Sequence, residues 1–308
     1  MMKPVARVNG EFASALLGIP VFDMRKVLWN GLMLTASVTF AVPLFSWSAF
    51  ALFLSTTYVT LLVGHSVGMH RMMIHRTFEC SKPVERLLIY IGVLVGVAGP
   101  FGILRVHDTR DWAQRQAECH EFFAHTRSLP RDLIWQLAYR FSFVRPPEFV
   151  IEPHFARDPF YIFLERTWQL HQIPVALVAF ALGGWSWVIW SVCMRVLVST
   201  IGHWTITYFC HRAGEGRWHI PGAAVQACNL PGLGMITYGE CWHNHHHAFP
   251  ESARIGLDKG QLDPGWWLIA ALERAGVAKN VGLPRAGDRR EDLVERKSMS
   301  SPSAEQHA

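Results

Sequence analysis

Residues 27–64 read VLWNGLMLTASVTFAVPLFSWSAFALFLSTTYVTLLVG and contain no Asp, Glu, Lys, Arg or His. A single membrane crossing takes about 20 apolar residues, so this stretch is long enough for two helices. Pro43, near its centre, cannot continue helical hydrogen bonding and therefore marks a turn. The stretch is too long for a signal peptide and has no clear cleavage site. We therefore predict a hairpin of two transmembrane helices, at about residues 27–45 and 47–68.

A second apolar block covers residues 172–210, in which only one arginine and one histidine can carry charge. The pair Gly183-Gly184 is its strongest turn signal. This pattern predicts a second hairpin, with helices at about residues 164–182 and 185–210. The expected fold is therefore an all-α integral membrane protein with four transmembrane helices in two hairpins.

The composition supports a multi-pass membrane protein. Of the 308 residues, 50% are hydrophobic and 17% are charged, whereas soluble domains average about 25% charged residues. Basic residues, which give a net charge of +5, are concentrated near the N-terminus and between the hairpins. Because such residues mark cytoplasmic segments, we predict that both termini and the middle loop are cytoplasmic. No basic stripe interleaved with aromatic residues indicates nucleic-acid binding, and six scattered cysteines without a CxxC pair argue against an iron–sulfur cluster.

The remaining segments complete the predicted organisation. Residues 87–104 are uncharged but rich in glycine, and a crossing there would separate the histidines on either side of the membrane. We interpret them as a shallow or re-entrant segment buried in protein. Residues 264–276 predict an interfacial helix with Trp at headgroup level, and the charged tail 285–308 predicts disorder. Residues 1–26 form a cytosolic N-terminal segment, and 27–284 form one domain.

Sixteen histidines are present, and many gather in three groups on the predicted cytoplasmic side. At about 100° per residue, His243, His246 and His247 share one helical arc, whereas His245 lies on the opposite face. Imidazoles this close repel one another when protonated, and a bound metal removes that cost. We therefore predict that these three converge on one metal site and that His245 does not. Imidazole binds iron, zinc, copper and nickel alike, so the ligand type does not select the metal.

The other two groups have different spacings. His107 and Asp111 are four residues apart, about 40° on a helix, which predicts a shared metal or a carboxylate that orients the imidazole. His65, His70 and His75 repeat every five residues, which places neighbours about 140° apart on an α-helix. All three cannot point one way from a regular helix, although two can do so near a helix end.

In this order, the histidines resemble the membrane-bound fatty acid desaturase superfamily, specifically its acyl-CoA branch of stearoyl-CoA-like Δ9 desaturases. The resemblance runs from about residue 64 to residue 276 and includes the hairpin–loop–hairpin plan. The run from His70 to Arg76 resembles the first histidine box of the branch. His243-Asn-His-His246-His247 resembles the third box, and His211 matches the isolated histidine ligand. The fold that the resemblance implies has a cytosolic helical cap holding a histidine-rich di-metal site.

The second box departs from the branch, which has HxxHH. Here only His107 survives, and Arg110 and Asp111 stand where the adjacent histidines would be. Thr207 replaces the asparagine that precedes the isolated histidine. The ligands implied are His70, His75, His107, Asp111, His211, His243, His246 and His247, with His65, His120 and His125 as alternative replacements for Asp111. A dinuclear site and a mononuclear, divergent site both remain open.

The resemblance implies an oxidoreductase that introduces a cis double bond into a long acyl chain, using O2, two electrons and a di-iron centre. The chain has neither ferredoxin-like cysteine spacing nor a convincing haem-binding segment, so a separate reductase and small electron carrier are implied. The substrate would be a long-chain acyl thioester or a lipid. A related di-iron lipid hydroxylase and a non-catalytic metal-binding membrane protein are the alternatives. The absence of an HExxH motif argues against a zinc hydrolase.

Overall fold

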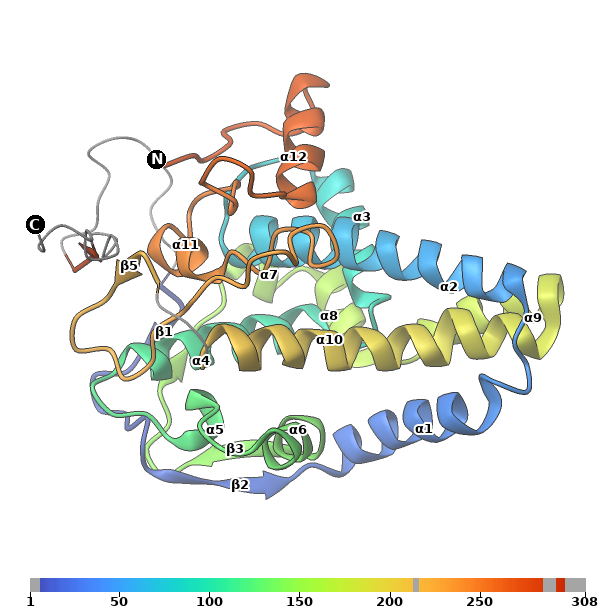
Figure 1. Cartoon of the computed structure of the whole chain (residues 1–308), viewed down its shortest axis with the longest axis horizontal. Helices are drawn as coiled ribbons and strands as arrows, with labels where there is room; N and C mark the ends of the chain where they lie inside the picture. Colours follow the sequence, from blue (N-terminus) through green and yellow to red (C-terminus); the bar gives the residue numbers. More distant parts are fainter. Residues whose placement is uncertain (1–5, 213–215, 285–291, 297–308) are drawn as a thin grey trace, which may run out of the picture.

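The computed structural model describes residues 6–212, 216–284 and 292–296. Long helices run along the molecule, and shorter helices and loops gather at one end (Figure 1). The helices are α1 (Met24–Phe40), α2 (Trp47–Val59), η1 (Thr60–Ile74), α3 (Lys82–Val93), α4 (Pro100–Arg115), α5 (Glu121–Ala124), α6 (Leu129–Ala138), α7 (Pro153–Ala156), α8 (Pro159–Thr167), α9 (Gln172–Val188), η2 (Ile189–Met194), α10 (Arg195–Cys210), α11 (His243–Ala248) and α12 (Pro264–Arg274), where η denotes a π-helix.

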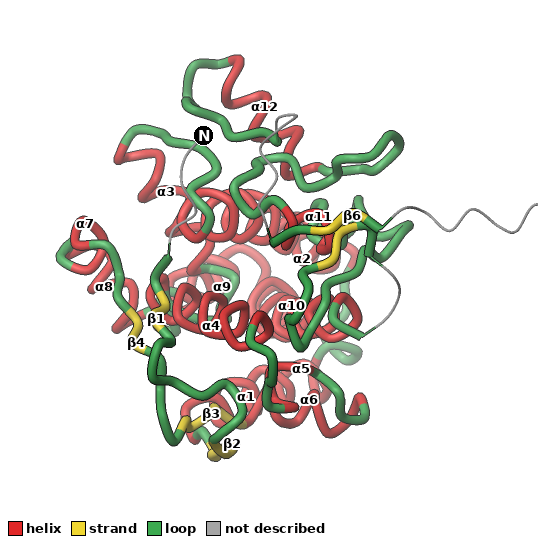
Figure 2. The backbone as a smooth tube through the Cα atoms, turned by 90° about the vertical axis from the view of Figure 1, so that its left-hand side faces the viewer, coloured by secondary structure: helices red, strands yellow, loops and turns green. Residues whose placement is uncertain are grey.

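The prediction of an all-α fold is corrected by three short antiparallel pairs of strands. These are β1 (Val8–Asn9) with β4 (Glu148–Phe149), β2 (Gly18–Phe22) with β3 (Tyr139–Phe143), and β5 (Trp218–His219) with β6 (Val294–Glu295). They lie at the edge of the helical bundle (Figure 2). The first two pairs attach the N-terminal segment to the middle loop, which hydropathy alone does not reveal.

The first two predicted helices are present as α1 and α2, and a turn joins them. Helix α1 starts where Asp23 accepts a hydrogen bond from the Lys26 backbone N–H, and α2 starts where Ser46 accepts one from Ala49. The predicted turn around Pro43 is thus confirmed. Helix α2 continues directly into η1, so the helix extends beyond the predicted end at residue 68. The combined segment, Trp47–Ile74, is long and apolar enough to cross a membrane.

The second apolar segment, Gln172–Cys210, meets the same criterion of length and composition. Its backbone breaks at Gly184, which has φ 63° and ψ −158°, a conformation that favours glycine. Arg195 donates a hydrogen bond to Gln172, 23 residues away in sequence. The segment therefore folds back on itself, and the predicted turn at Gly183-Gly184 is confirmed.

The predicted start of this hairpin at residue 164 is wrong. Leu164 belongs to α8, which ends at Thr167, and a turn separates it from α9. Pro174 gives the physical reason, because its ring would clash with the carbonyl four residues earlier in a continuous helix. Proline is compatible with the first turn of the new helix, where it lies.

Residues 87–104 do not form one helix. They are divided between α3 and α4 by a turn in which Gly96 has φ 79°, which confirms that they are not a single spanning helix. Helix α3 packs closely on η1: a Cβ atom on Gly64 would lie 2.3 Å from the backbone nitrogen of Gly92. Glycine at this contact allows α3 to support the segment that carries the first histidine box.

Two further predictions concern the C-terminal part. The helix predicted at residues 264–276 is present as α12, whose Asp263 cap accepts from the Trp266 backbone N–H. The predicted disordered tail, 285–308, lies outside the described residues except for 292–296. Those residues include β6, so disorder is not the right description for this short part of the tail.

Candidate metal centre

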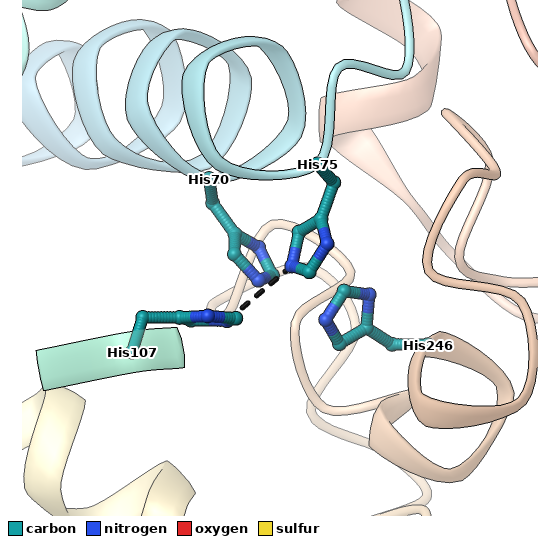
Figure 3. A group of neighbouring side chains, drawn as sticks. All are labelled: His70, His75, His107 and His246. Carbon is teal, nitrogen blue, oxygen red and sulfur yellow. Dashed lines mark hydrogen bonds between the residues drawn. The ribbon is translucent and has the colours of Figure 1, made fainter. Parts of the chain in front are cut away.

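Four histidines converge at the end of η1. The ligand nitrogens of His70, His75, His107 and His246, called here the four-histidine group, all lie within 4.8 Å of one another. Their rings approach from η1, α4 and α11 (Figure 3). The Nε2 atoms of His75 and His107 are 3.3 Å apart. Four imidazole nitrogens this close could bind one metal ion.

The π-helix explains why the five-residue spacing works. Its hydrogen bonds join residues i and i+5, so side chains five apart lie nearly above one another. The rings of His70 and His75 are 4.8 Å apart between centroids. Two of the three histidines thus point one way, as expected near a helix end, although the helix is π rather than α. His65 contacts His203 at 3.9 Å between ring centroids and is outside the group.

A second group lies beside the first. His211, His243 and His247 place their ligand nitrogens within 4.8 Å of one another and form the three-histidine group. The Nε2 atoms of His243 and His247 are 3.1 Å apart. The three third-box histidines that were predicted to converge are thus divided between the two neighbouring groups. His243 and His247 are four residues apart and share a direction, whereas His246 points to the four-histidine group. Helix α11 lies between the two groups, with ring centroids of His243 and His246 5.7 Å apart.

Each group has acceptors that hold the outer ring nitrogens. Oε2 of Glu240 lies 2.7 Å from Nδ1 of His70, and Oδ1 of Asp108 lies 3.0 Å from Nδ1 of His107. In the three-histidine group, the backbone carbonyl of Thr207 lies 2.7 Å from Nδ1 of His211. Such partners fix the tautomer and orientation, leaving Nε2 to bind a metal.

Sequence reasoning assigned no role to Glu240 or Asp108. Burial alone would raise the pKa of Glu240, but its interactions with His70 and Arg71 hold it well below its ordinary value. Its position just before the third box was visible in the sequence, but its contact with the first box is tertiary. The contacts of Arg7 are also tertiary: it donates to the Ile74 carbonyl (3.0 Å) and to Asp108 (2.9 Å).

Asp111 belongs to neither group. Its Oδ2 lies 3.8 Å from Nδ1 of His107, which is too far for a hydrogen bond and on the side of the ring that faces away from His75. Arg110 lies 3.3 Å from both Oδ1 of Asp111 and Oγ1 of Thr207. Burial opposes ionisation of Asp111, but His107 and the neighbouring arginines hold its pKa well below the ordinary range.

The remaining predictions for histidines are resolved by their partners. Nε2 of His245 lies 3.2 Å from Oδ2 of Asp258, so the prediction that His245 faces away from the site is confirmed. Nδ1 of His120 accepts from the Phe122 backbone N–H at 3.1 Å and caps α5. His125 contacts Asp132, and Nδ1 lies 3.0 Å from its nearer carboxylate oxygen.

The electrostatics favour neutral imidazoles. Burial is the main reason that the pKa of the site histidines outside the apolar helices lies below the ordinary value, and charge repulsion from neighbouring imidazoles adds to it. These are His75, His243, His246 and His247, together with His211, whose pKa is lowered to about 3. Neutral imidazole is the metal-binding form. Nε2 of His211 has no hydrogen-bond partner among the described residues, as expected of a nitrogen reserved for a ligand, so the donor set fits a transition metal.

Comparison with known proteins agrees with this geometry. The chain is 32% identical to an sn-2 palmitoyl-lipid 9-desaturase from a Nostoc species, over 77% of the chain and 82% of that protein. The chain belongs to the membrane-bound fatty acid desaturase superfamily. It is also 30% identical to an sn-1 stearoyl-lipid 9-desaturase from Anabaena variabilis, over 84% of the chain and 93% of the relative.

The chain is also similar to a desaturase that is named for a different class of substrate. An acyl-CoA 5-desaturase from Anemone leveillei is 28% identical, over 78% of the chain and 74% of its own length. No protein-family model matches the chain. The relatives thus include desaturases named for acyl-lipids and desaturases named for acyl-CoA, which agrees with the superfamily expected from the histidine boxes and covers more than the acyl-CoA branch.

Proposed function

We propose that this protein is a desaturase that introduces a cis double bond into a long acyl chain. The observation that carries the proposal is the pair of histidine groups, which unites seven imidazoles from η1, α4, α11 and the end of α10. One of the two long apolar helical segments, Trp47–Ile74, carries His70 of the first box, and the other, Gln172–Cys210, ends directly before His211. The names of the relatives support the same activity.

The two groups would hold two iron ions, one each. With O2 and two electrons, such a centre supplies an oxidant able to remove hydrogen from an unactivated methylene, which side chains cannot do. The protein engages the Nδ1 atoms of three of these imidazoles: Glu240 orients His70, Asp108 orients His107, and the Thr207 carbonyl orients His211. Asp111 remains a candidate eighth ligand.

The proposed topology has four crossings in two hairpins, with the metal centre and both termini on the cytoplasmic side. The fold-back at Gly184 and the turn around Pro43 support it, as does the excess of basic residues in the middle loop. Helix α12, with Trp266 and Trp267 near its start, would lie at the membrane interface. A separate reductase and a small electron carrier would deliver the electrons.

The substrate would be an acyl chain on a lipid or on CoA, because the relatives are named for both kinds. The test is expression of the full chain in a host with a defined fatty acid profile and a compatible reductase, comparing wild type with His246→Ala. New monounsaturated fatty acids with wild type alone are the expected result. Hydroxylated fatty acids would instead indicate a hydroxylase, and an unchanged profile despite bound iron would exclude desaturation. Separate analysis of lipids and acyl-CoA identifies the substrate pool.

A further inference from the structure

The two histidine groups are unequal in number of ligands. One group has four imidazoles and the other has three, while the second box supplies Arg110 and Asp111 in place of histidines. A guanidinium cannot bind a cation, and Asp111 lies on the outer side of His107. The three-histidine group therefore needs a ligand from elsewhere in the chain if its ion is to be held as firmly as the other.

The sequence offers three further histidines as replacement ligands, and two of them contact other residues. His65 packs edge-on against His203, at 3.9 Å between ring centroids. His120 caps α5 with Nδ1, and its ring lies against Phe141 at 4.6 Å. These contacts occupy His65 and His120, whereas the ring of His125 lies beside that of His211.

His125 is built like a metal ligand. It is 2% exposed, and Nδ1 lies 3.0 Å and 3.2 Å from the two carboxylate oxygens of Asp132. Its Nε2 is buried and has no hydrogen-bond partner within the described ranges. A buried nitrogen without a hydrogen-bond partner is unfavourable. An imidazole with its outer nitrogen on a carboxylate and its inner nitrogen unpaired matches the carboxylate–histidine–metal arrangement.

The position of the ring points to the same group. Its centroid lies 6.0 Å from that of His211, with the planes 23° apart. Within the three-histidine group, the corresponding separation of His211 and His247 is 5.3 Å. Nε2 of His211 is also buried and unpaired among the residues that the structure describes. Two unsatisfied imidazole nitrogens thus lie on neighbouring rings. His125 is not one of the residues whose ligand nitrogens all lie within 4.8 Å of one another, so its ring has to move closer to His211 when an ion binds.

The surroundings hold His125 in place. Asp132 is fully buried and also accepts from the indole N–H of Trp204 at 2.7 Å, on the same helix as the residue that orients His211. The backbone of His125 has φ 52°, a left-handed conformation that is uncommon for a residue other than glycine. This residue ends α5, where a left-handed conformation is common, and its backbone N–H donates to the Glu121 carbonyl.

We propose that His125, oriented by Asp132, is the fourth imidazole ligand of the three-histidine group and replaces a histidine missing from the second box. The inference rests on the proposed metal centre and extends it. It predicts two four-imidazole positions in a chain whose second box supplies only one histidine.

The test uses the full chain, purified in detergent, freed of metal and loaded with Co²⁺ alone. Bound cobalt is counted per chain after a fixed wash with a chelator. Wild type and the matched control His120→Asn should keep two ions, whereas His125→Asn should keep about one. Asp132→Asn should release that ion faster than wild type without removing a ligand.

A second variant makes the test independent of a loss of folding. His125→Cys should bind cobalt through the introduced thiolate and show a thiolate-to-cobalt charge-transfer band that wild type lacks, measured on the monodisperse fraction. Two ions retained by His125→Asn, together with no new band in His125→Cys, would overturn the assignment while leaving the metal centre intact. A wild type that binds no cobalt would overturn both this inference and the proposed centre.

Discussion

The four-histidine and three-histidine groups are built in different ways. The first combines three elements distant in sequence, and carboxylates hold two of its rings, through Glu240 and Asp108. The second combines the end of α10 with α11, and a backbone carbonyl holds His211. Arg110 lies beside it and lowers the pKa of His211, after burial. The first group thus brings together four imidazoles and the second brings together three.

The largest expected effect comes from removing a ligand of the stronger group. His246→Ala should reduce desaturation to background and remove one metal ion per chain, because no other side chain in this buried group can take the place of the lost imidazole ligand. Fatty acid analysis and metal content measure the two effects. His245→Gln is the matched control from the same helix, since His245 faces Asp258 instead. Activity retained in His246→Ala would contradict the role of this group.

Next is the carboxylate that orients His70. Glu240→Gln keeps the size of the side chain but removes its charge, and loss of such a partner lowers metal affinity roughly 10–100-fold. The decrease should affect the four-histidine group, measured by competition with a chelator. Asp258→Asn, which alters a carboxylate beside His245 outside both groups, should leave metal affinity unchanged. Equal losses in the two variants would show a general effect on folding instead.

A smaller effect in the opposite direction is expected at Arg110. Arg110→Gln removes a positive charge near His211, so metal affinity at the three-histidine group should rise by roughly tenfold, equivalent to about 1.4 kcal/mol. Titration with Co²⁺ measures the weaker of the two binding steps. Arg131→Gln, an exposed residue of the same loop, should leave that step unchanged. Weaker binding in Arg110→Gln would mean that the guanidinium supports the group.

The smallest effect concerns the metal-free protein and pH. The pKa values of His243, His246 and His247 are lowered by burial and by neighbouring imidazoles, so the unfolded chain binds more protons than the folded chain in mild acid. Stability is therefore full above the unfolded pKa of about 6.5 and falls as the pH drops below it toward the lowered folded values. The melting temperature should fall between pH 7 and pH 5, and bound metal should reduce the change. An unchanged melting temperature over this range would contradict buried neutral imidazoles.

The hairpins show how far hydropathy predicts the fold. The uncharged runs, Pro43 and Gly183-Gly184 gave correct turns, because helices cannot continue through such residues without losing hydrogen bonds or adopting unusual dihedral angles. The start of α9 was predicted too early, since Leu164 is as apolar as the residues of the true helix. Pro174 marks the start of α9, because its ring would clash with the preceding turn if the helix continued back toward Leu164.

The site shows a similar division. Spacing on α11 correctly separated His245 from its neighbours, since direction around a short helix follows from the residue number. It did not show that His246 serves a different group from His243 and His247, because that depends on which elements pack on either side of α11. Side chains five residues apart, such as His70 and His75, point in different directions on an α-helix but in similar directions on the π-helix found here.

The sequence by itself determined the apolar hairpins, the residue types of the metal centre and the superfamily, because hydrophobic length and histidine spacing are local properties of a chain. Only the tertiary structure decided how seven histidines divide into two groups and which carboxylates orient them. It also placed His125 and Asp132 near His211. The physical reason is that a metal position is defined by the convergence of side chains from distant segments, and convergence depends on packing rather than on any one segment.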